Sequence, residues 1–221
     1  LNAEILERIT ACGIEKVLVH QIPRIYVINT GSELLLPGSP IKTGQIYNSN
    51  RSLLSAKVAG SGAIPVLADS IIKDDLQQIV NEIEKATPVS DMIIISGGTG
   101  NGVYDLVYNA FEYLNASPLF KGISITPGKG TSAALFNGKL LYNLSGNPYA
   151  AGILFEVLIK PALLKLKGDL FSAREWFDIQ LDSPIKKIKP YRRLCQGEML
   201  IEQGRVYAQP VSGNNNPIKN T

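Results

Sequence analysis

The sequence predicts an α/β protein, in which helices cover both faces of a mostly parallel sheet. Runs of β-branched and apolar residues, typical of buried strands, alternate along the chain with segments whose apolar residues recur at helical spacing. The clearest strand patterns, at 25–29 and 92–96, each run into a turn that contains glycine. After residue 168 the pattern changes to alternation with period two, which predicts a small β-rich region.

These patterns divide the chain into three parts. Residues 1–23 contain a short helix at 5–12 and a short strand at 17–19, and are expected to be a lead-in from an upstream region. Residues 24–168 hold the strand–helix alternation, and residues 169–221 hold the β-rich region. The last part is short for a self-sufficient core, so this domain is expected to be incomplete or dependent on its neighbours.

Helix signals follow the first two strands. Asparagines and a serine at 48–50 are good helix caps, and the helix behind them should stop at Gly60. A second strand is predicted at 65–68. Asp74 is expected to begin the next helix, because Gln77 stands at the spacing of a capping box.

The third strand, 92–96, runs into a loop with four glycines in six residues, and Asp105 follows before the next helix. Glycine lets backbone N–H groups approach a ligand, and a helix start adds unpaired N–H groups, so this segment could bind an anion such as phosphate. The loop lacks both a P-loop ending and the dinucleotide spacing. From this loop alone, an anion site and a simple turn are equally good interpretations.

Further elements are predicted after this helix. A strand at 123–125 precedes a turn that carries Lys129, and Asn137-Gly138 between apolar runs predicts a hairpin. Asn147 should cap a long helix that ends at Gly168 and is kinked at Pro161.

Composition excludes several classes. The 221 residues are 45% hydrophobic and carry a net charge of +3, as suits one full-sized domain with room for a small one. One histidine and two distant cysteines, Cys12 and Cys195, disfavour a zinc site or a histidine-based triad and favour a reduced, cytoplasmic protein. We expect no membrane partner, since no apolar run reaches spanning length. We expect no nucleic-acid partner either, because the basic cluster at 186–193 has only one aromatic residue, Tyr191.

Six motifs in a fixed order resemble the molybdopterin molybdenumtransferase family, which includes MoeA and the gephyrin E domain. They are Thr30-Gly31-Ser32-Glu33-Leu34, 44–50, Lys73-Asp74-Asp75, 97–105, Thr126-Pro127-Gly128-Lys129 and Ser145-Gly146-Asn147-Pro148. The resemblance implies a MogA-like three-layer α/β domain followed by a β domain. It also implies a homodimer that inserts molybdate into adenylylated molybdopterin, with release of AMP and the aid of Mg²⁺.

The resemblance also implies site residues. The catalytic residues would be Glu33, Asp74 and Asp105, of which Glu33 and Asp105 are candidate metal ligands. The substrate-binding residues would be Thr30, Gly31, Ser32, Gly97, Gly98, Thr99, Gly100, Asp105, Lys121, Pro127, Lys129, Gly146, Asn147 and Pro148. Simpler interpretations stand beside these: Asp74 and Asp105 could be helix caps, and both lysines could be solvated surface residues.

The chain departs from the family pattern at several positions of these motifs. An aspartate, a serine and a lysine of the family are replaced by Ser32, Gly100 and Thr126, and two prolines are replaced by Gly130 and Ser145. Losing a lysine weakens charge-assisted contact with a phosphate. These departures predict a divergent member with weakened catalysis. Two alternatives therefore remain: a molybdopterin-binding or protein-interaction module without turnover, and a MogA-like molybdopterin adenylyltransferase.

Overall fold

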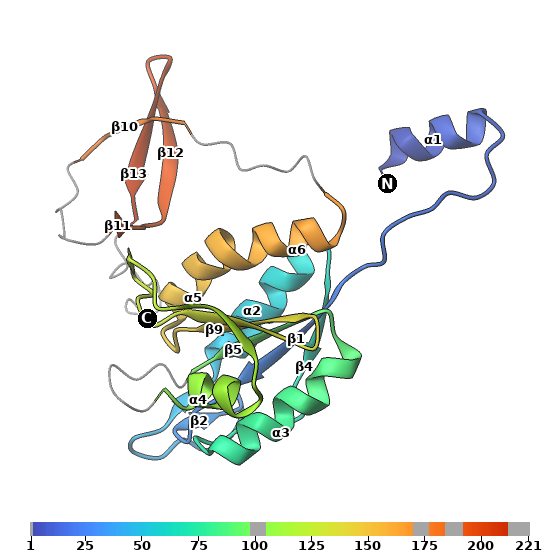
Figure 1. The fold of residues 1–221 in the computed structure, drawn as a ribbon. Coiled ribbons are helices and arrows are strands. Elements are labelled where there is room, and N and C mark those ends of the chain that lie inside the picture. Colours follow the sequence, from blue (N-terminus) through green and yellow to red (C-terminus); the bar gives the residue numbers. More distant parts are fainter. Residues whose placement is uncertain (1, 98–104, 170–176, 184–191, 212–221) are drawn as a thin grey trace.

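The computed structural model describes residues 2–97, 105–169, 177–183 and 192–211 and has a six-stranded sheet at its centre (Figure 1). The strands lie in the order β4 (Ile64–Leu67), β1 (Arg24–Asn29), β5 (Met92–Ser96), β9 (Lys139–Leu144), β8 (Ser132–Phe136) and β6 (Ser117–Lys121). The first four are parallel to one another, and β8 and β6 extend the sheet by antiparallel pairing. The prediction of a mostly parallel sheet is thus confirmed.

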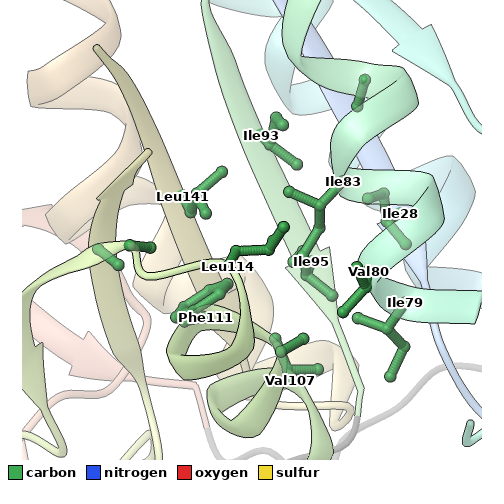
Figure 2. Close-up of a cluster of buried hydrophobic side chains, with 14 of the residues drawn as sticks. Ile28, Ile79, Val80, Ile83, Ile93, Ile95, Val107, Phe111, Leu114 and Leu141 are labelled. Carbon is green, nitrogen blue, oxygen red and sulfur yellow. The ribbon is translucent and has the colours of Figure 1, made fainter. Parts of the chain in front are cut away.

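Two helices cover one face of the sheet, α3 (Leu76–Ala86) and α4 (Leu106–Tyr113). Their apolar sides, which include Ile83 and Phe111, pack against Ile28 of β1 and Ile93 and Ile95 of β5 (Figure 2). These three isoleucines lie on one face because side chains alternate along a strand.

The other face is covered by α2 (Ser49–Gly60) and by a helical run of α5 (Pro148–Leu154), the π-helical turn η2 (Phe155–Ile159) and α6 (Lys160–Leu166). Leu54, Phe155 and Ile159 are fully buried against the residues that alternate with the isoleucines, such as Val27 and Ile94. The architecture therefore has the three predicted layers. The π turn lies just before Pro161, which has no N–H to donate to the preceding turn.

The local turn predictions agree well with the structure. Asn137 and Gly138 join β8 to β9 with φ angles of 48° and 74°, the left-handed region that a tight hairpin of this kind requires. Asn147 caps α5, since its side chain accepts a hydrogen bond from the N–H of Ala150, and Pro148 occupies the first turn.

Two strand predictions were wrong. Residues 17–19 are exposed and form no strand, because no neighbouring strand pairs with them. No strand spans 123–125: the strand before this range, β6, ends at Lys121 and includes Pro118. Since β6 lies at the edge of the sheet, it tolerates a residue without an N–H. Ile125 instead belongs to β7 (Ile125–Thr126), which pairs with β11 (Arg192–Arg193).

The remaining elements lie around the three-layer body. Helix α1 (Ala3–Ala11) has no buried residue and stands apart from the sheet (Figure 1). The other short elements are β2 (Leu34–Leu35), β3 (Ile46–Tyr47), η1 (Thr87–Val89) and a small sheet of β10 (Gln180–Leu181), β13 (Arg205–Pro210) and β12 (Gly197–Glu202). The domain boundaries at residues 23 and 168 stay predictions.

Two observations bear on the cellular environment. Among the described residues, no helix combines the length and the apolar character needed to cross a membrane. Cys12 and Cys195 are both exposed and unbridged. The cytoplasmic location that cysteine usage suggested stays a prediction.

Candidate functional site

The carboxyl ends of the three central parallel strands meet closely. Thr30 follows β1, Gly97 follows β5, and Gly146 lies two residues beyond β9. A Cβ added to Gly97 would collide with the carbonyl oxygen of Thr30, and one added to Gly146 would lie 3.6 Å from the Cα of Gly97. Gly97 also has a φ of 123°, which side chains rarely tolerate. The backbone after β5 therefore approaches the backbone after β1 more closely than a residue larger than glycine at position 97 would allow.

A cavity of about 550 Å³ opens at these strand ends. The residues of its lining that the sequence predicted as site residues are Thr30, Gly31, Glu33, Asp74, Gly97, Gly146, Asn147 and Pro148. Its position agrees with the rule that ligands of open α/β sheets bind beyond the carboxyl ends of the strands. The segments after β1, β5 and β9 thus contribute to one concave surface.

Polar side chains make up the floor of this cavity. The amide nitrogen Nδ2 of Asn50 donates to Ser96 Oγ at 2.6 Å and to the carbonyl oxygen of Gly146 at 2.8 Å, which ties α2 to β5 and to the loop after β9. Asn29, Thr30 and Asn48 are also buried in the lining. Together with Asn50 they hold five polar atoms that are buried without a hydrogen-bond partner in the described part of the chain.

Two carboxylates lie at the exposed rim of the cavity. Asp74 Oδ2 accepts a hydrogen bond from the N–H of Ser32 at 2.9 Å, and Ser32 Oγ accepts one from the N–H of Asp74 at 3.3 Å. Glu33 follows in the same turn. The capping role expected for Asp74 was wrong: Asp75 is the N-cap of α3 and accepts from the N–H of Gln78 at 2.9 Å. Asp74 is thereby left to hold the turn that carries Glu33.

Asp105 has a different environment and is not part of the described cavity lining. Its Oδ1 caps α4 by accepting from the N–H of Tyr108 at 3.0 Å, and it also accepts from Asn143 Nδ2 at 3.1 Å. Burial raises the pKa of this carboxyl above its ordinary value, against the opposing effects of the Tyr108 N–H and the charge of Lys121. Capping and a ligand role are compatible here, because the cap uses the Oδ1 atom of the carboxylate.

Neither predicted lysine is among the described residues of the cavity lining, and the charge of Lys121 acts on Asp105 instead. The ammonium of Lys121 lies 3.7 Å from the centre of the Tyr108 ring, a cation–π contact. Pro127 follows a cis peptide bond, and the turn that carries Lys129 is closed by a 3.0 Å hydrogen bond from the N–H of Ile123 to the Lys129 carbonyl. The predicted residues Gly98, Thr99 and Gly100 lie outside the described residues.

The two carboxylates at the rim suit a hard cation whose other ligands come from a bound molecule and from water. Within the described ranges, no cluster of three or more histidine, cysteine or acidic side chains could enclose a metal ion. Glu33 and Asp74, however, both line the cavity. Mg²⁺ is commonly held by one or two carboxylates together with phosphate oxygens and waters, so the rim fits Mg²⁺ carried in with a phosphorylated ligand.

Two of the departures from the family pattern take part in hydrogen bonds. Ser32 exchanges the two hydrogen bonds with Asp74, and Ser145 Oγ accepts from the N–H of Asn147 at 3.2 Å. The Oγ of Thr126 is buried without a partner in the described part of the chain. Gly100 lies outside the described residues.

Sequence reasoning missed Asn29, Asn50 and Ser96 as parts of the cavity. Asn29 and Ser96 are polar residues that close otherwise apolar strands, and they are register partners. This polar ending of two strong strands was the available signal. Asn50 was interpreted as a helix cap, but Asn48 takes that position and Asn50 points into the core.

Comparison with known proteins gives a consistent result. The chain is 30% identical over 214 residues to a molybdopterin molybdenumtransferase of Staphylococcus epidermidis. The aligned region covers 97% of this chain and 51% of that protein. It is 31% identical over 199 residues to the molybdopterin molybdenumtransferase of Bacillus subtilis, covering 90% of this chain and 46% of that protein. The chain thus spans about half the length of these relatives.

Comparison with solved structures leads to the same group of proteins. A crystal structure of the molybdopterin biosynthesis MoeA protein from Pyrococcus horikoshii superposes with a TM-score of 0.79 at 28% identity, over 99% of this chain and 52% of that one. The family described as "Probable molybdopterin binding domain" matches residues 26–165, which include β5, β9, all of β1 but its first two residues, and the whole described cavity lining. The chain therefore belongs to the family of probable molybdopterin-binding domains.

Proposed function

We propose that this chain acts in molybdenum cofactor biosynthesis, by binding adenylylated molybdopterin at the cavity for the insertion of molybdate and the release of AMP. The observation that carries the proposal is the convergence of three strand-end motifs on one cavity with two carboxylates at its rim. The relatives named as molybdopterin molybdenumtransferases support the reaction, and the family match supports the ligand.

Different residues of the chain would have different roles in binding. Glu33 and Asp74 would hold Mg²⁺ at the rim, and the cation would neutralise the phosphate oxygens of the ligand. The hydrogen bonds between Ser32 and Asp74 would keep both carboxylates in place. Asp105, with Lys121 nearby, would face the part of the ligand that lies outside the cavity lining.

We further propose that the working unit is a homodimer. The resemblance to the MoeA family supports this assembly. Molybdate is proposed as the second substrate on the same grounds.

The experiment is a single-turnover assay on the purified protein. Adenylylated molybdopterin, molybdate and Mg²⁺ are supplied, and AMP is measured by chromatography. We expect AMP release that depends on both molybdate and Mg²⁺. ATP consumption with free molybdopterin and no molybdate would instead identify the adenylyltransferase. The result that contradicts the proposal is an absence of both AMP release and ligand binding when the substrate is verified as intact.

Ser32 favours a second candidate, a binding module without turnover. It stands where the MoeA family has an aspartate, and its hydroxyl is engaged with the backbone of Asp74, so one negative charge is missing from the rim. Binding of adenylylated molybdopterin without AMP release would support this candidate. Restored turnover in a Ser32→Asp variant would show that the missing charge is the cause.

A further inference from the structure

A fully buried amide contacts the carboxylate of Asp105. Asn143 of β9 is 0% exposed. It lies on the sheet face that α3 and α4 cover, since Leu141, two residues earlier on the strand, packs in the core on that side. Its Nδ2 donates to both carboxylate oxygens of Asp105, at 3.1 Å and 3.5 Å. An apolar side chain would fill this position without losing hydrogen bonds to water, so the amide must be retained for a contact of its own.

The orientation of this amide follows from the charge of its partner. An ionised carboxylate only accepts hydrogen bonds, so the nitrogen of the Asn143 amide must face Asp105. The other amide atom, Oδ1, is buried and has no partner in the described part of the chain. Within that part, the Asn143 side chain is hydrogen-bonded to Asp105 alone. The cost of burying Asn143 is therefore offset by this one contact.

Capping of α4 does not explain the second donor. Asp75 caps α3 with the same type of bond, which its Oδ1 accepts from an N–H three residues on, at 2.9 Å compared with 3.0 Å for Asp105. No side chain in the described part of the chain donates to Asp75. A helix of this fold thus begins on an aspartate without a buried amide behind it. The contact between Asn143 and Asp105 is additional to the cap.

The strand register places Asn143 in a polar row across the sheet. Asn143 pairs with Ser132 of β8, and Ser132 pairs with Lys121 of β6. Register partners point to the same face, so all three side chains lie on the side of α4. The ammonium of Lys121 accordingly lies 3.7 Å from the centre of the Tyr108 ring of α4. Asn143 by hydrogen bonding and Lys121 by charge both act on the carboxylate of Asp105.

Asn143 has no direct route to a ligand, because it has no exposed surface and is not among the described residues of the cavity lining. Asp105 is only half-buried, so an effect of the amide on a ligand must pass through this carboxylate. We propose that Asn143 is a positioning residue, which holds the Asp105 carboxylate in the orientation that meets the ligand. The inference rests on the proposed function, which assigns Asp105 to the part of the ligand outside the cavity lining. A group that is fixed before binding loses less conformational entropy when the ligand arrives.

The test compares two buried polar residues of the same row. Asn143→Leu removes the amide at similar volume, and Asn143→Ala removes it without added bulk. Ser132→Ala is the matched control, because Ser132 is 1% exposed with an unpartnered Oγ and has no bond to Asp105 in the described part of the chain. A further comparison places Asn143→Leu in an Asp105→Ser background, in which serine keeps the helix cap and removes the carboxylate.

Three quantities are measured: the carboxyl-carbon NMR signal of Asp105 without ligand at neutral pH, the calorimetric affinity for adenylylated molybdopterin with Mg²⁺, and the thermal unfolding midpoint. We expect both Asn143 variants to shift the Asp105 signal and to weaken binding about 10-fold. Ser132→Ala should leave the signal in place and the affinity within about twofold. In the Asp105→Ser background, Asn143→Leu should change the affinity by less than about twofold, because the carboxylate through which it acts is gone.

Three results would overturn the inference: an Asp105 signal that neither Asn143 variant shifts, binding in these variants as tight as in the unaltered protein, or an equal loss in the Asp105→Ser background. A merely structural role would lower the unfolding midpoint and weaken binding equally in both backgrounds. Its failure is distinct from failure of the proposed function. If Asn143→Leu binds adenylylated molybdopterin as the unaltered protein does, only the positioning role is refuted. If the unaltered protein does not bind it at all, both are refuted.

Discussion

Asp74 Oδ2 accepts a hydrogen bond from the N–H of Ser32 at 2.9 Å, although the two residues are 42 positions apart in the sequence. This bond joins the segment before α3 to the turn after β1, which carries Glu33, and both carboxylates line the cavity. The proposed function assigns Mg²⁺ to this rim, where the two carboxylates and phosphate oxygens of the ligand would hold it.

Replacing Asp74 by asparagine should remove the charge and keep the acceptor for Ser32. We expect Mg²⁺-dependent binding of adenylylated molybdopterin, and AMP release if it occurs, to fall at least ~10-fold. The free energy of unfolding should change by less than ~0.5 kcal/mol, because the site is exposed. Calorimetric titration with and without Mg²⁺ measures the first effect, and urea unfolding measures the second.

Asp75→Asn provides the matched control one residue away. Asparagine is as good an N-cap as aspartate, so α3 should persist and Mg²⁺ dependence should be unchanged. Equal losses in Asp74→Asn and Asp75→Asn would mean that general charge, rather than coordination at the rim, governs binding.

Much of the fold could be predicted because its signals are local. The β-branched and apolar runs at 25–29 and 92–96 predict buried strands without any long-range information. The dipeptide Asn137-Gly138 likewise predicts a hairpin turn from two residues alone. β6 was missed because a proline usually ends a strand, and only the sheet order shows that β6 lies at an edge. Asp74 and Asp75 are equal caps in sequence, and the contact with Ser32 decides between them.

The site was predictable only in part, for a similar reason. Residues that follow strand ends could be placed together because parallel strands end at one edge of the sheet. The contact of Asn50 with Gly146 joins positions 96 residues apart, and that of Asn143 with Asp105 joins positions 38 apart. No local pattern records such pairs, so neither the polar floor nor the environment of Asp105 could be derived from spacing.

The raised pKa of Asp105 predicts a pH-dependent stability. The folded protein binds this proton more tightly than the unfolded chain, so ionisation of Asp105 opposes folding as pH rises through the folded pKa. Asp105→Asn, which keeps the cap, should therefore gain stability relative to the unaltered protein as the pH rises from the acidic range to neutrality. Urea unfolding across this range measures the difference. If the difference in the free energy of unfolding between Asp105→Asn and the unaltered protein did not change with pH, burial would not disfavour the carboxylate form of Asp105.

The charge of Lys121 lowers the pKa of Asp105, so removing that charge should raise it further. Lys121→Met keeps an apolar chain of similar length over the Tyr108 ring. Carboxyl-carbon NMR titration follows Asp105 directly. Lys139→Met, which removes a lysine paired with Asp91, is the control and should leave the Asp105 titration unchanged. Identical titrations in the two variants would place Lys121 too far from Asp105 to act on it.

Gly97 should be the least replaceable glycine of the cavity. In Gly97→Ala the new Cβ would collide with the Thr30 carbonyl, and its φ of 123° disfavours any side chain. We expect a loss of more than ~2 kcal/mol in the free energy of unfolding and a loss of ligand binding. Gly60→Ala is the control: this glycine ends α2 with open space around its Cβ position, and alanine there should raise stability by up to ~1 kcal/mol. Urea unfolding compares the two variants. If Gly97→Ala were as stable as Gly60→Ala, the strand ends would have room to separate, and the close approach of β1 and β5 would not define the cavity floor.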